Sequence, residues 1–282
     1  MSHPDAAGAA AEYARRHGLP SPEHVRTGST AVFTAGPEVV LRIGGTSQAA
    51  TADADWRRLM DRAGVRVPGS RGEIEVIAGL CVAPIERVAP DATVDWAAVG
   101  EMVRRLHSIG PVSLLPSCTS FPHWRFGHLL DELAPLVDEE SAQALRACHE
   151  RHRGWEDRAT GVSAVALHGD VHPGNVVATA SGPVLIDWDL RSAGPPAWDH
   201  APLMRWTERW GGAPGVYEEF ASGYGRSFRG DPLAESLAEL RLLAATLMRI
   251  AARRRDPSAA DELEVRLRWW REPHGAPAWT AQ

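Results

Sequence analysis

The chain contains no lysine, and all 30 basic residues among its 282 residues are arginine. Reactions that proceed through a lysine Schiff base are therefore excluded. A site that binds phosphate must also work without the lysine that often fills this role. Arginine can replace it because the planar guanidinium group binds phosphate through two parallel hydrogen bonds.

Cysteine is scarce as well. The three cysteines, Cys81, Cys118 and Cys148, are widely spaced and form no C-x-x-C pair. This spacing argues against a disulfide framework or a cysteine-based zinc site and favours a reducing compartment. The first residues lack the basic region and long apolar core of a signal peptide, so we expect none there, and no run approaches the ~18 apolar residues of a membrane span. We therefore expect a cytoplasmic protein without a membrane partner.

An excess of positive charge is also absent, since the formal net charge is -6 at pH 7. Proteins that bind nucleic acids usually carry a basic face, so this charge argues against a nucleic-acid partner. The composition, with 44% hydrophobic and 23% charged residues, is that of an ordinary globular protein. A chain of 282 residues can form one large domain or two modest ones with a cleft for a small molecule.

Residues 1–86 are predicted to form a small α+β lobe. The residues Gly36–Pro37–Glu38 separate two strand-like runs and are typical of a hairpin turn. A second turn, at Gly28–Ser29–Thr30, can bring backbone amides close to a phosphate, which makes Ser29 a candidate cofactor-binding residue. The elements expected in this lobe are helices at Pro4–His17 and Ser47–Ala63 and strands at Ala31–Ala35, Val39–Ile43, Glu73–Ala78 and Leu80–Ile85.

Residues 87–282 are predicted to form a larger, mainly helical lobe. After a polar connector at 86–95, apolar residues recur near helical spacing. The helices expected in this lobe cover residues 94–109, 127–136, 139–156, 198–210, 214–228, 232–254 and 259–270.

The stretch Ala166–Leu190 concentrates the side chains that can bind metal, protons or phosphate. Two short apolar runs, Val162–Leu167 and Val184–Ile186, are expected to form a strand–loop–strand hairpin that presents these side chains to a cleft. The six side chains are His168, Asp170, His172, Asn175, Asp187 and Asp189.

Three of these residues, Asp170, Asn175 and Asp187, suit phosphoryl transfer. One carboxylate can orient an attacking hydroxyl and accept its proton, while an amide and a second carboxylate hold Mg²⁺ on nucleotide phosphates. The structural alternative is a set of Asx-turns without catalysis. The spacing of the three residues and the strands that flank them favour the catalytic interpretation.

The same stretch also matches three ordered motifs. H-G-D-x-x-x-x-N is met by residues 168–175, I-D-W by residues 186–188, and G-x-P-x-W-D-x-A by residues 194–201. On these motifs the chain resembles the aminoglycoside phosphotransferase and choline kinase family, small-molecule relatives of the protein kinases. The predicted helix that ends in Arg105–Leu106–His107 is similar to the family's helix that closes in R-L-H.

The resemblance implies a bilobal, protein-kinase-like fold of the α+β class that binds ATP or GTP between its lobes. Asp170 would then be the catalytic base, and Asn175 and Asp187 would be ligands of Mg²⁺. The hinge near Pro84–Val88 would hold the adenine. The candidate nucleotide contacts at this hinge are Glu86 and Val88.

The chain departs from the family pattern at two positions. Arg42 stands on the strand where the family has a phosphate-binding lysine, and we expect Arg42 to take over that role. The acidic partner of this residue on the following helix is also not obvious. Asp53 is the candidate because helical spacing turns it toward the same face as Trp56 and Met60, whereas Asp55 is turned away.

The acceptor-binding residues carry no motif of their own. Trp206 and Trp210 follow the third motif on a predicted helix, in the region where the family places its acceptor, and Glu208 can add negative charge there. Asp189 is a further candidate for contact with metal or substrate, with a turn cap as the alternative. A solvated helix face is the alternative for Glu208.

Among the remaining polar residues of the motifs, we expect some to contact the ligands and others to support the loop. His172 is a candidate for contact with phosphate or substrate, and packing of the loop is the alternative. His168 is expected to support the loop rather than touch substrate. Asp199 is expected to hold the catalytic loop through hydrogen bonds to its backbone.

We therefore predict an ATP-dependent O-phosphotransferase that acts on a small polar molecule and is a monomer or homodimer. An aminoglycoside-like antibiotic is one candidate acceptor, which would make the protein a resistance enzyme. A metabolic kinase for choline, a sugar or an amino alcohol is the alternative, and a catalytically silent pseudokinase is a second one. A zinc hydrolase built on His168, Asp170 and His172 leaves the spacing of Asn175 and Asp187 unexplained.

Overall fold

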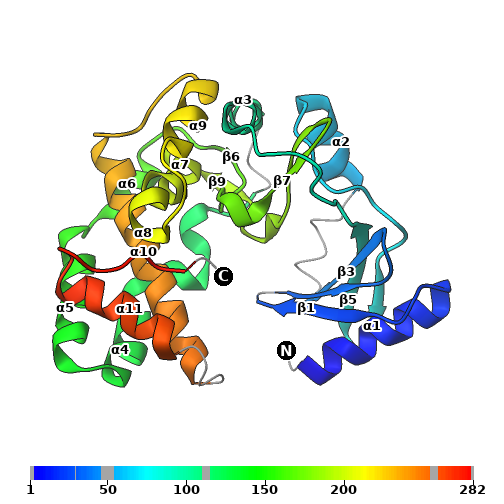
Figure 1. The fold of residues 1–282 in the computed structure, drawn as a ribbon, viewed down its shortest axis with the longest axis horizontal. Coiled ribbons are helices and arrows are strands. Elements are labelled where there is room, and N and C mark those ends of the chain that lie inside the picture. The colour runs from blue at the N-terminus through cyan, green and yellow to red at the C-terminus, as the bar shows by residue number, and fades with distance from the viewer. Residues whose placement is uncertain (1–2, 29, 46–53, 110–114, 255–259, 281–282) are drawn as a thin grey trace. The chain divides into compact units, whose positions relative to one another are not determined.

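The computed structural model describes residues 3–28, 30–45, 54–109, 115–254 and 260–280 (Figure 1). The predicted cofactor-binding residues Ser29 and Asp53 lie outside the described residues. By its internal contacts the chain separates into unit 1, residues 1–95 and 175–189, and unit 2, residues 96–174 and 190–282. The lobe boundary after residue 86 stays a prediction.

Unit 1 contains a five-stranded antiparallel sheet with the strand order β1-β2-β3-β5-β4. Helix α1 presents small side chains and Tyr13 to this sheet, where Leu41 and Ile43 of the central strand β3 are fully buried. The prediction of an α+β fold with an N-terminal antiparallel sheet is confirmed. Its elements are α1 (His3–His17), β1 (Glu23–Thr27), β2 (Ala31–Thr34), β3 (Val39–Gly44), α2 (Ala54–Ala63), β4 (Glu75–Ile77) and β5 (Leu80–Glu86).

Strand β1 is an element that the sequence does not predict. All five of its residues are exposed, and the register of its pairing with β2 shifts between His24 and Arg26. An edge strand that pairs on one side and buries no face lacks the alternation of apolar and polar residues that identifies a strand. The strand nevertheless matters because it carries Arg26.

The predicted hairpin between Val162–Leu167 and Val184–Ile186 is wrong. Strand β6 (Val165–Leu167) pairs with β9 (Ser192–Gly194), and β7 (Val176–Thr179) pairs with β8 (Gly182–Leu185). A turn of two residues joins β7 to β8, and so short a loop closes at much lower entropic cost than the longer loop of the predicted pairing. The motif stretch therefore contributes to both units, with residues 175–189 in unit 1 and the loop before them in unit 2.

Unit 2 is mainly helical, as predicted. Figure 1 shows the long helix α10 running through this unit, and α10 contacts α4, α5, α6, α7 and α11. Two of the expected helices are each broken into two shorter ones, α5 with α6 and α7 with α8. The helices are α3 (Trp96–His107), α4 (Phe126–Leu133), α5 (Glu139–Arg151), α6 (Trp155–Thr160), α7 (Ala197–Met204), α8 (Trp206–Trp210), α9 (Val216–Tyr224), α10 (Pro232–Arg253) and α11 (Ala260–Arg271).

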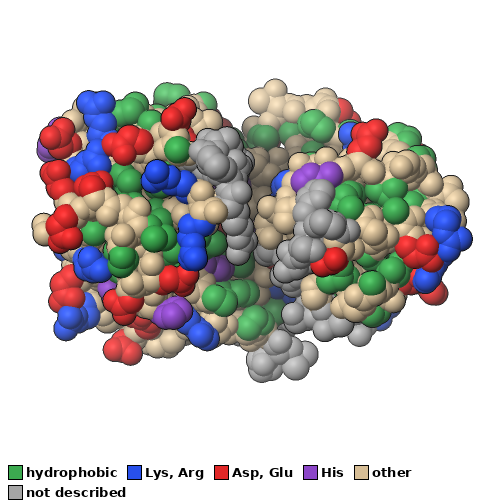
Figure 2. Space-filling view, turned by 90° about the horizontal axis from the view of Figure 1, so that it is seen from below, with side chains coloured by type: hydrophobic (Ala, Val, Ile, Leu, Met, Phe, Trp, Pro, Cys, Tyr) green, Lys and Arg blue, Asp and Glu red, His purple; other side chains and the backbone are tan. Residues whose placement is uncertain are grey.

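The surface of the described residues carries charges of both signs. On the face drawn in Figure 2, acidic and basic side chains lie interspersed among apolar ones and form no large patch of one sign. Within the described parts of the chain, none of the helices combines the length and the apolar character that a membrane crossing requires.

Two glycines allow α3 and α9 to approach closely. A Cβ at Gly223 would overlap the carbonyl oxygen of Ala97, and a Cβ at Gly100 would overlap that of Phe220. This contact matters for the site because the last residue of α9, Tyr224, lies with its hydroxyl 2.9 Å from Nδ1 of His107 at the end of α3.

We therefore expect Gly223→Ala to lower the free energy of unfolding by about 1–3 kcal/mol, the usual cost of overpacking. Chemical denaturation measures this change. Gly127→Ala is the matched control, because a Cβ at Gly127 of α4 meets no atom within 4 Å. If the two variants unfold at the same denaturant concentration, the close approach of α3 and α9 does not limit stability.

Candidate functional site

A buried carboxylate clamps the loop that carries Asp170. Asp199, on α7, is fully buried and accepts hydrogen bonds from the backbone N–H groups of His168 (2.9 Å) and Gly169 (2.7 Å). Nε2 of His107 lies 3.1 Å from Oδ2 of Asp199. Burial opposes the ionisation of Asp199, but the contact with His107 lowers its pKa below the ordinary value. The structure thus contains the hydrogen bonds to the loop backbone that were expected of Asp199.

The loop backbone leaves no room for a side chain at Gly169. This residue has a φ of +92°, and a Cβ there would overlap the carbonyl oxygen of Leu190. The neighbouring His168 is fully buried, and its Nδ1 accepts a hydrogen bond from the backbone N–H of Asp170 (3.2 Å). His168 therefore supports the loop, in keeping with the expectation from its position in the motif.

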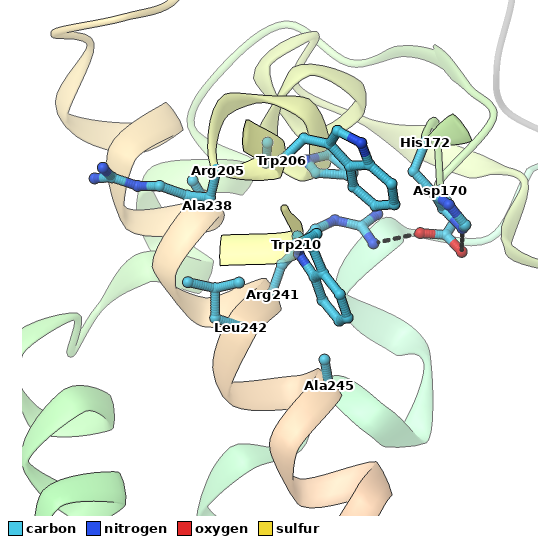
Figure 3. A pocket seen from close by; sticks show the side chains of 11 residues that line it. Asp170, His172, Arg205, Trp206, Trp210, Ala238, Arg241, Leu242 and Ala245 are labelled. Carbon is cyan, nitrogen blue, oxygen red and sulfur yellow. Dashed lines mark hydrogen bonds and ion pairs between the residues drawn. The ribbon is translucent and has the colours of Figure 1, made fainter. Parts of the chain in front are cut away.

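The Asp170 carboxylate lies between a guanidinium group and an imidazole. Arg241 of α10 donates from Nη1 to Oδ1 of Asp170 (2.8 Å) and from Nη2 to the carbonyl oxygen of Gly169, and Nε2 of His172 lies 3.4 Å from Oδ2 (Figure 3). Burial raises the pKa of Asp170, but His172 and Arg241 outweigh this effect and hold the pKa well below the ordinary range. Asp170 is therefore ionised at neutral pH.

Asp170 lines a cavity of about 210 Å³ within unit 2. The predicted acceptor residues Trp206 and Trp210 line the same cavity (Figure 3), and their rings stack with centroids 5.9 Å apart. The ring of His172 stacks on Trp206 at 5.7 Å. The cavity is lined by Asp170, His172, Ala201, Pro202, Arg205, Trp206, Trp210, Ala238, Arg241, Leu242 and Ala245.

Two other candidates for acceptor contacts lie elsewhere. Glu208 does not line this cavity and instead pairs with Arg205 at 3.1 Å. Asp189 lies in unit 1, where its Oδ1 is 2.7 Å from Nη2 of Arg42 and its Oδ2 is 3.2 Å from the hydroxyl of Thr30. The structure therefore groups Asp189 with the predicted phosphate-binding arginine.

Unit 1 brings the two predicted metal ligands to the same end of a hairpin. Asn175 directly precedes β7 and Asp187 follows β8, and the backbone N–H of Ile186 donates to the carbonyl oxygen of Asn175 (3.0 Å). Asn175 is 6% exposed. Asp187 has a φ of +64°, a conformation that costs energy for a residue with a side chain. Strain of this kind is common at functional sites.

Arg42 binds both carboxylates at this end of the hairpin. Its Nη2 lies 3.0 Å from Oδ1 of Asp187 and 2.7 Å from Oδ1 of Asp189. The Arg42 side chain is only 9% exposed, so the two ion pairs are shielded from solvent. Arg26 of β1 approaches the other oxygen of Asp187 at 2.5 Å and is half exposed. The acidic residues at this end of the hairpin are therefore bound by two arginines, Arg42 and Arg26, rather than by the single arginine that the sequence suggests.

This group fits a hard cation such as Mg²⁺. Asn175 and Asp187 supply only oxygen donors, and Mg²⁺ prefers oxygen. An ionised carboxylate offers about four lone-pair sites, so the arginines and a cation can share the carboxylate of Asp187. Asn175 and Asp187 would hold the ion.

The predicted hinge residues have structural contacts. The backbone N–H of Glu86 donates to the carbonyl oxygen of Gly69 (2.8 Å), and Oε2 of Glu86 accepts from the N–H of Gly69 (3.0 Å). Val88 is half-buried in the connector that follows β5. A nucleotide contact at either residue stays a prediction.

The sequence does not reveal two arginines that contact the predicted site residues, Arg241 beside Asp170 and Arg26 beside Asp187. Arg241 lies 71 positions after Asp170 in a helix without a motif. The absence of lysine is a signal that would direct attention to every arginine, but it does not distinguish these two from the other arginines.

Two histidines of unit 2 give stability a pH dependence. Burial lowers the pKa of His200 to about 3 and that of His123 to about 4. The unfolded chain, where histidine has a pKa near 6.5, therefore binds more protons than the folded chain as the pH falls. We expect stability to fall between pH 7 and 5, with a slope of up to ~1.4 kcal/mol per pH unit for each histidine.

Chemical denaturation at pH 7 and 5 measures this loss. His200 lies in a cage of aromatic rings, so His200→Phe should keep the packing and remove one histidine's share of the pH dependence. His128→Gln, an exposed position on α4, should leave the dependence unchanged. A wild-type protein that is equally stable at both pH values would contradict the burial of these rings in neutral form.

The fold is that of the protein-kinase-like enzymes. A sequence model described as the phosphotransferase enzyme family matches residues 24–243. The chain belongs to this family. A search of curated proteins gave no match.

Solved structures with the same fold align with most of the chain. Spectinomycin phosphotransferase APH(9)-Ia in complex with ADP and spectinomycin has a TM-score of 0.63 at 14% identity, covering 92% of this chain and 90% of its own. Aminoglycoside phosphotransferase APH(3'')-Id from Streptomyces rimosus has a TM-score of 0.61 at 19% identity, with 86% and 99% covered. Amicoumacin kinase hAmiN in complex with AMP-PNP, Ca²⁺ and Ami has a TM-score of 0.64 at 12% identity, with 93% of each chain covered. At these identities the likeness shows the fold.

Proposed function

We propose that the protein transfers the γ-phosphate of ATP or GTP to a hydroxyl group of a small molecule. The observation that carries the proposal is the position of Asp170. This ionised carboxylate stands on a loop clamped by Asp199 and lines a cavity with two tryptophans. A carboxylate so placed can receive the hydroxyl of an acceptor.

In this mechanism the acceptor hydroxyl donates a hydrogen bond to Asp170. The acceptor oxygen forms a bond to the γ-phosphorus while the bond from this phosphorus to the β,γ-bridging oxygen breaks, and the hydroxyl proton passes to Asp170. Because its low pKa makes Asp170 a weak base, most of its effect comes from orienting the hydroxyl.

The residues of unit 1 serve the nucleotide. Arg42 and Arg26 bring positive charge to its phosphates, as the missing lysine would. Mg²⁺, when bound by Asn175 and Asp187, neutralises charge on the phosphates. The family pattern of a metal-binding Asn and Asp is retained in full, which favours an active enzyme over a pseudokinase.

The zinc hydrolase interpretation has less support. Nδ1 of the fully buried His168 is used by the backbone N–H of Asp170, so His168 is a poor metal ligand. Within the described parts of the chain, the group of His, Cys and acidic side chains close enough to share an ion is Cys148, His152 and Glu239. This group does not include His168, Asp170 or His172.

Antibiotics are candidate acceptors because the similar structures include a spectinomycin phosphotransferase and an amicoumacin kinase. Sugars, choline and other amino alcohols are the candidates if the protein is a metabolic kinase. The cytoplasmic location and the monomeric or homodimeric state stay predictions.

An ATP-consumption screen tests the proposal. The wild-type protein with ATP and Mg²⁺ is combined with aminoglycosides, peptide antibiotics, sugars, amino alcohols and nucleosides, and ADP release is followed. We expect release that depends on one class of acceptor. Product formation that needs zinc and proceeds without ATP would instead support a hydrolase.

A further inference from the structure

The charge around the Asp170 cavity differs from what a polycationic acceptor requires. Of the described residues that line it, Asp170 alone carries a carboxylate, and Arg241 brings a guanidinium group to it. Arg205 also lines the cavity, but its guanidinium group is paired with Glu208 and Glu235 and points away from Asp170 in Figure 3. The carboxylate of Asp170 already has Arg241 at 2.8 Å and His172 at 3.4 Å. A cationic acceptor would therefore sit beside a guanidinium group without a second carboxylate in the lining to balance it.

Arg241 is held in place from several directions. It bonds both to Asp170 and to the carbonyl oxygen of Gly169, and its Cζ lies 5.3 Å from the ring centroid of Trp124. The side chain is 13% exposed. Figure 3 shows the Arg241 guanidinium reaching past the two tryptophans toward Asp170. A cation that entered the cavity would have to compete with a well-fixed positive charge.

The aromatic rings offer a surface for a flat, apolar ring. His172, Trp206 and Trp210 form a consecutive stack with interplanar angles of 24° and 21°. Trp206 and Trp210 are both half-buried, so part of each ring is open to a ligand. The rest of the lining includes Ala201, Pro202, Ala238, Leu242 and Ala245, which are apolar.

Tryptophan faces also attract cations, but at Trp210 an arginine of the protein already uses this interaction. Cζ of Arg266 lies 5.0 Å from the ring centroid of Trp210, and Arg266 is 5% exposed. A quaternary ammonium group at Trp210 would therefore lie near a second cation, whereas an uncharged ring would not be repelled by Arg266.

We propose that the cavity beside Asp170 selects a hydroxylated acceptor that carries a planar apolar ring and no net positive charge. The inference rests on the proposed function, in which Asp170 receives the acceptor hydroxyl. At about 210 Å³ the cavity is smaller than a typical site for a whole drug-sized ligand, so it takes the ring and the hydroxyl next to it. Among the candidate acceptors, polycationic aminoglycosides are therefore disfavoured by the charge and the apolar lining of the cavity.

The test compares three aryl glucosides that differ in the charge of one substituent, with kanamycin added as a polycation. The glucosides share one ring and one set of hydroxyls, and they are phenyl β-glucoside, its para-carboxy derivative and its para-aminomethyl derivative. Calorimetry measures their binding to the full chain saturated with AMP-PNP and Mg²⁺. We expect the neutral and anionic glucosides to bind at least about tenfold more tightly than the cationic glucoside and kanamycin.

Two variants identify the residues responsible. Trp206→Leu should weaken the aryl glucosides about tenfold, and Arg241→Met should narrow or reverse the preference against the cationic glucoside. Arg253→Met is the matched control, because Arg253 is an exposed arginine on the same helix. It should leave the order of affinities unchanged.

Binding and phosphate transfer are recorded separately, so the two proposals can fail separately. Binding in the expected order without ADP release from ATP upholds the selectivity and contradicts the kinase. ADP release driven by kanamycin, with equal or tighter binding of cations, overturns the selectivity and leaves the kinase intact. Failure of every aryl glucoside to bind also overturns the selectivity.

Discussion

Replacing Asp170 by asparagine is expected to lower kcat for phosphate transfer about 10²- to 10⁴-fold, the usual contribution of a positioned acid–base group. The amide retains the size of the side chain and can still contact Arg241 through its oxygen. It cannot accept a proton and no longer carries the charge that orients the acceptor hydroxyl. ADP release in the presence of an active acceptor measures the change.

The variant should remain folded. Asp199, not Asp170, holds the loop backbone, and Asp170 is partly exposed. Asp131→Asn makes the same chemical change at an exposed position of α4 and should keep full activity. Activity of Asp170→Asn within about tenfold of the wild type would show that Asp170 is not the catalytic carboxylate.

Replacing Arg42 by alanine is expected to lower kcat/KM for ATP by at least about 10²-fold, or about 2.7 kcal/mol, the usual cost of removing one preorganised group that stabilises charge in the transition state. Arg42 lies within 3.0 Å of both Asp187 and Asp189. Without Arg42 these two carboxylates face one another with less compensating charge. The position that the missing lysine would fill is then also vacant.

Arg42→Lys separates charge from geometry. The ammonium group restores the charge but not the planar guanidinium group that places Nη2 between both carboxylates, so we expect a loss of about tenfold, between wild type and alanine. Arg26→Ala, at a half-exposed pair with Asp187 alone, should have a smaller effect than Arg42→Ala. Titration with AMP-PNP and thermal melting distinguish lost nucleotide binding from lost stability. Unchanged AMP-PNP affinity in Arg42→Ala would contradict the assignment.

The sequence predicts best those features that local chemistry determines. Apolar periodicity and turn residues such as Gly36–Pro37 predict the α1 helix, the strands from β2 to β5 and the helices of unit 2. The roles expected of His168 and Asp199 also follow from the motifs, because both act on the loop backbone next to Asp170.

Features that depend on distant parts of the chain are predicted less well. The pairing of β6 with β9 joins residues on either side of a complete hairpin, and short apolar runs do not specify their partners. Strand β1 has no buried face to reveal it. Arg241 comes to Asp170 from a helix whose sequence shows only an amphipathic pattern, so its ion pair appears only in three dimensions.

The arginines connect the composition with the chemistry of the site. Arg42 binds the two acidic residues that follow β8, and Arg241 binds the carboxylate of Asp170. In each unit, therefore, a guanidinium group sets the charge beside the predicted reactive residues. We expect Arg42 to replace a lysine of the family pattern, and the proposed selectivity assigns to Arg241 a part in which acceptor can bind.

The most direct test of phosphate transfer uses ATP labelled with ³²P at the γ-position. Wild-type protein and Asp170→Asn are each incubated with the labelled nucleotide, Mg²⁺ and an acceptor that stimulates ADP release, and the products are separated. The proposed function predicts that the wild type places the label in an organic phosphate monoester and that the variant does not. Label found only as inorganic phosphate, or equal transfer by both proteins, would contradict it.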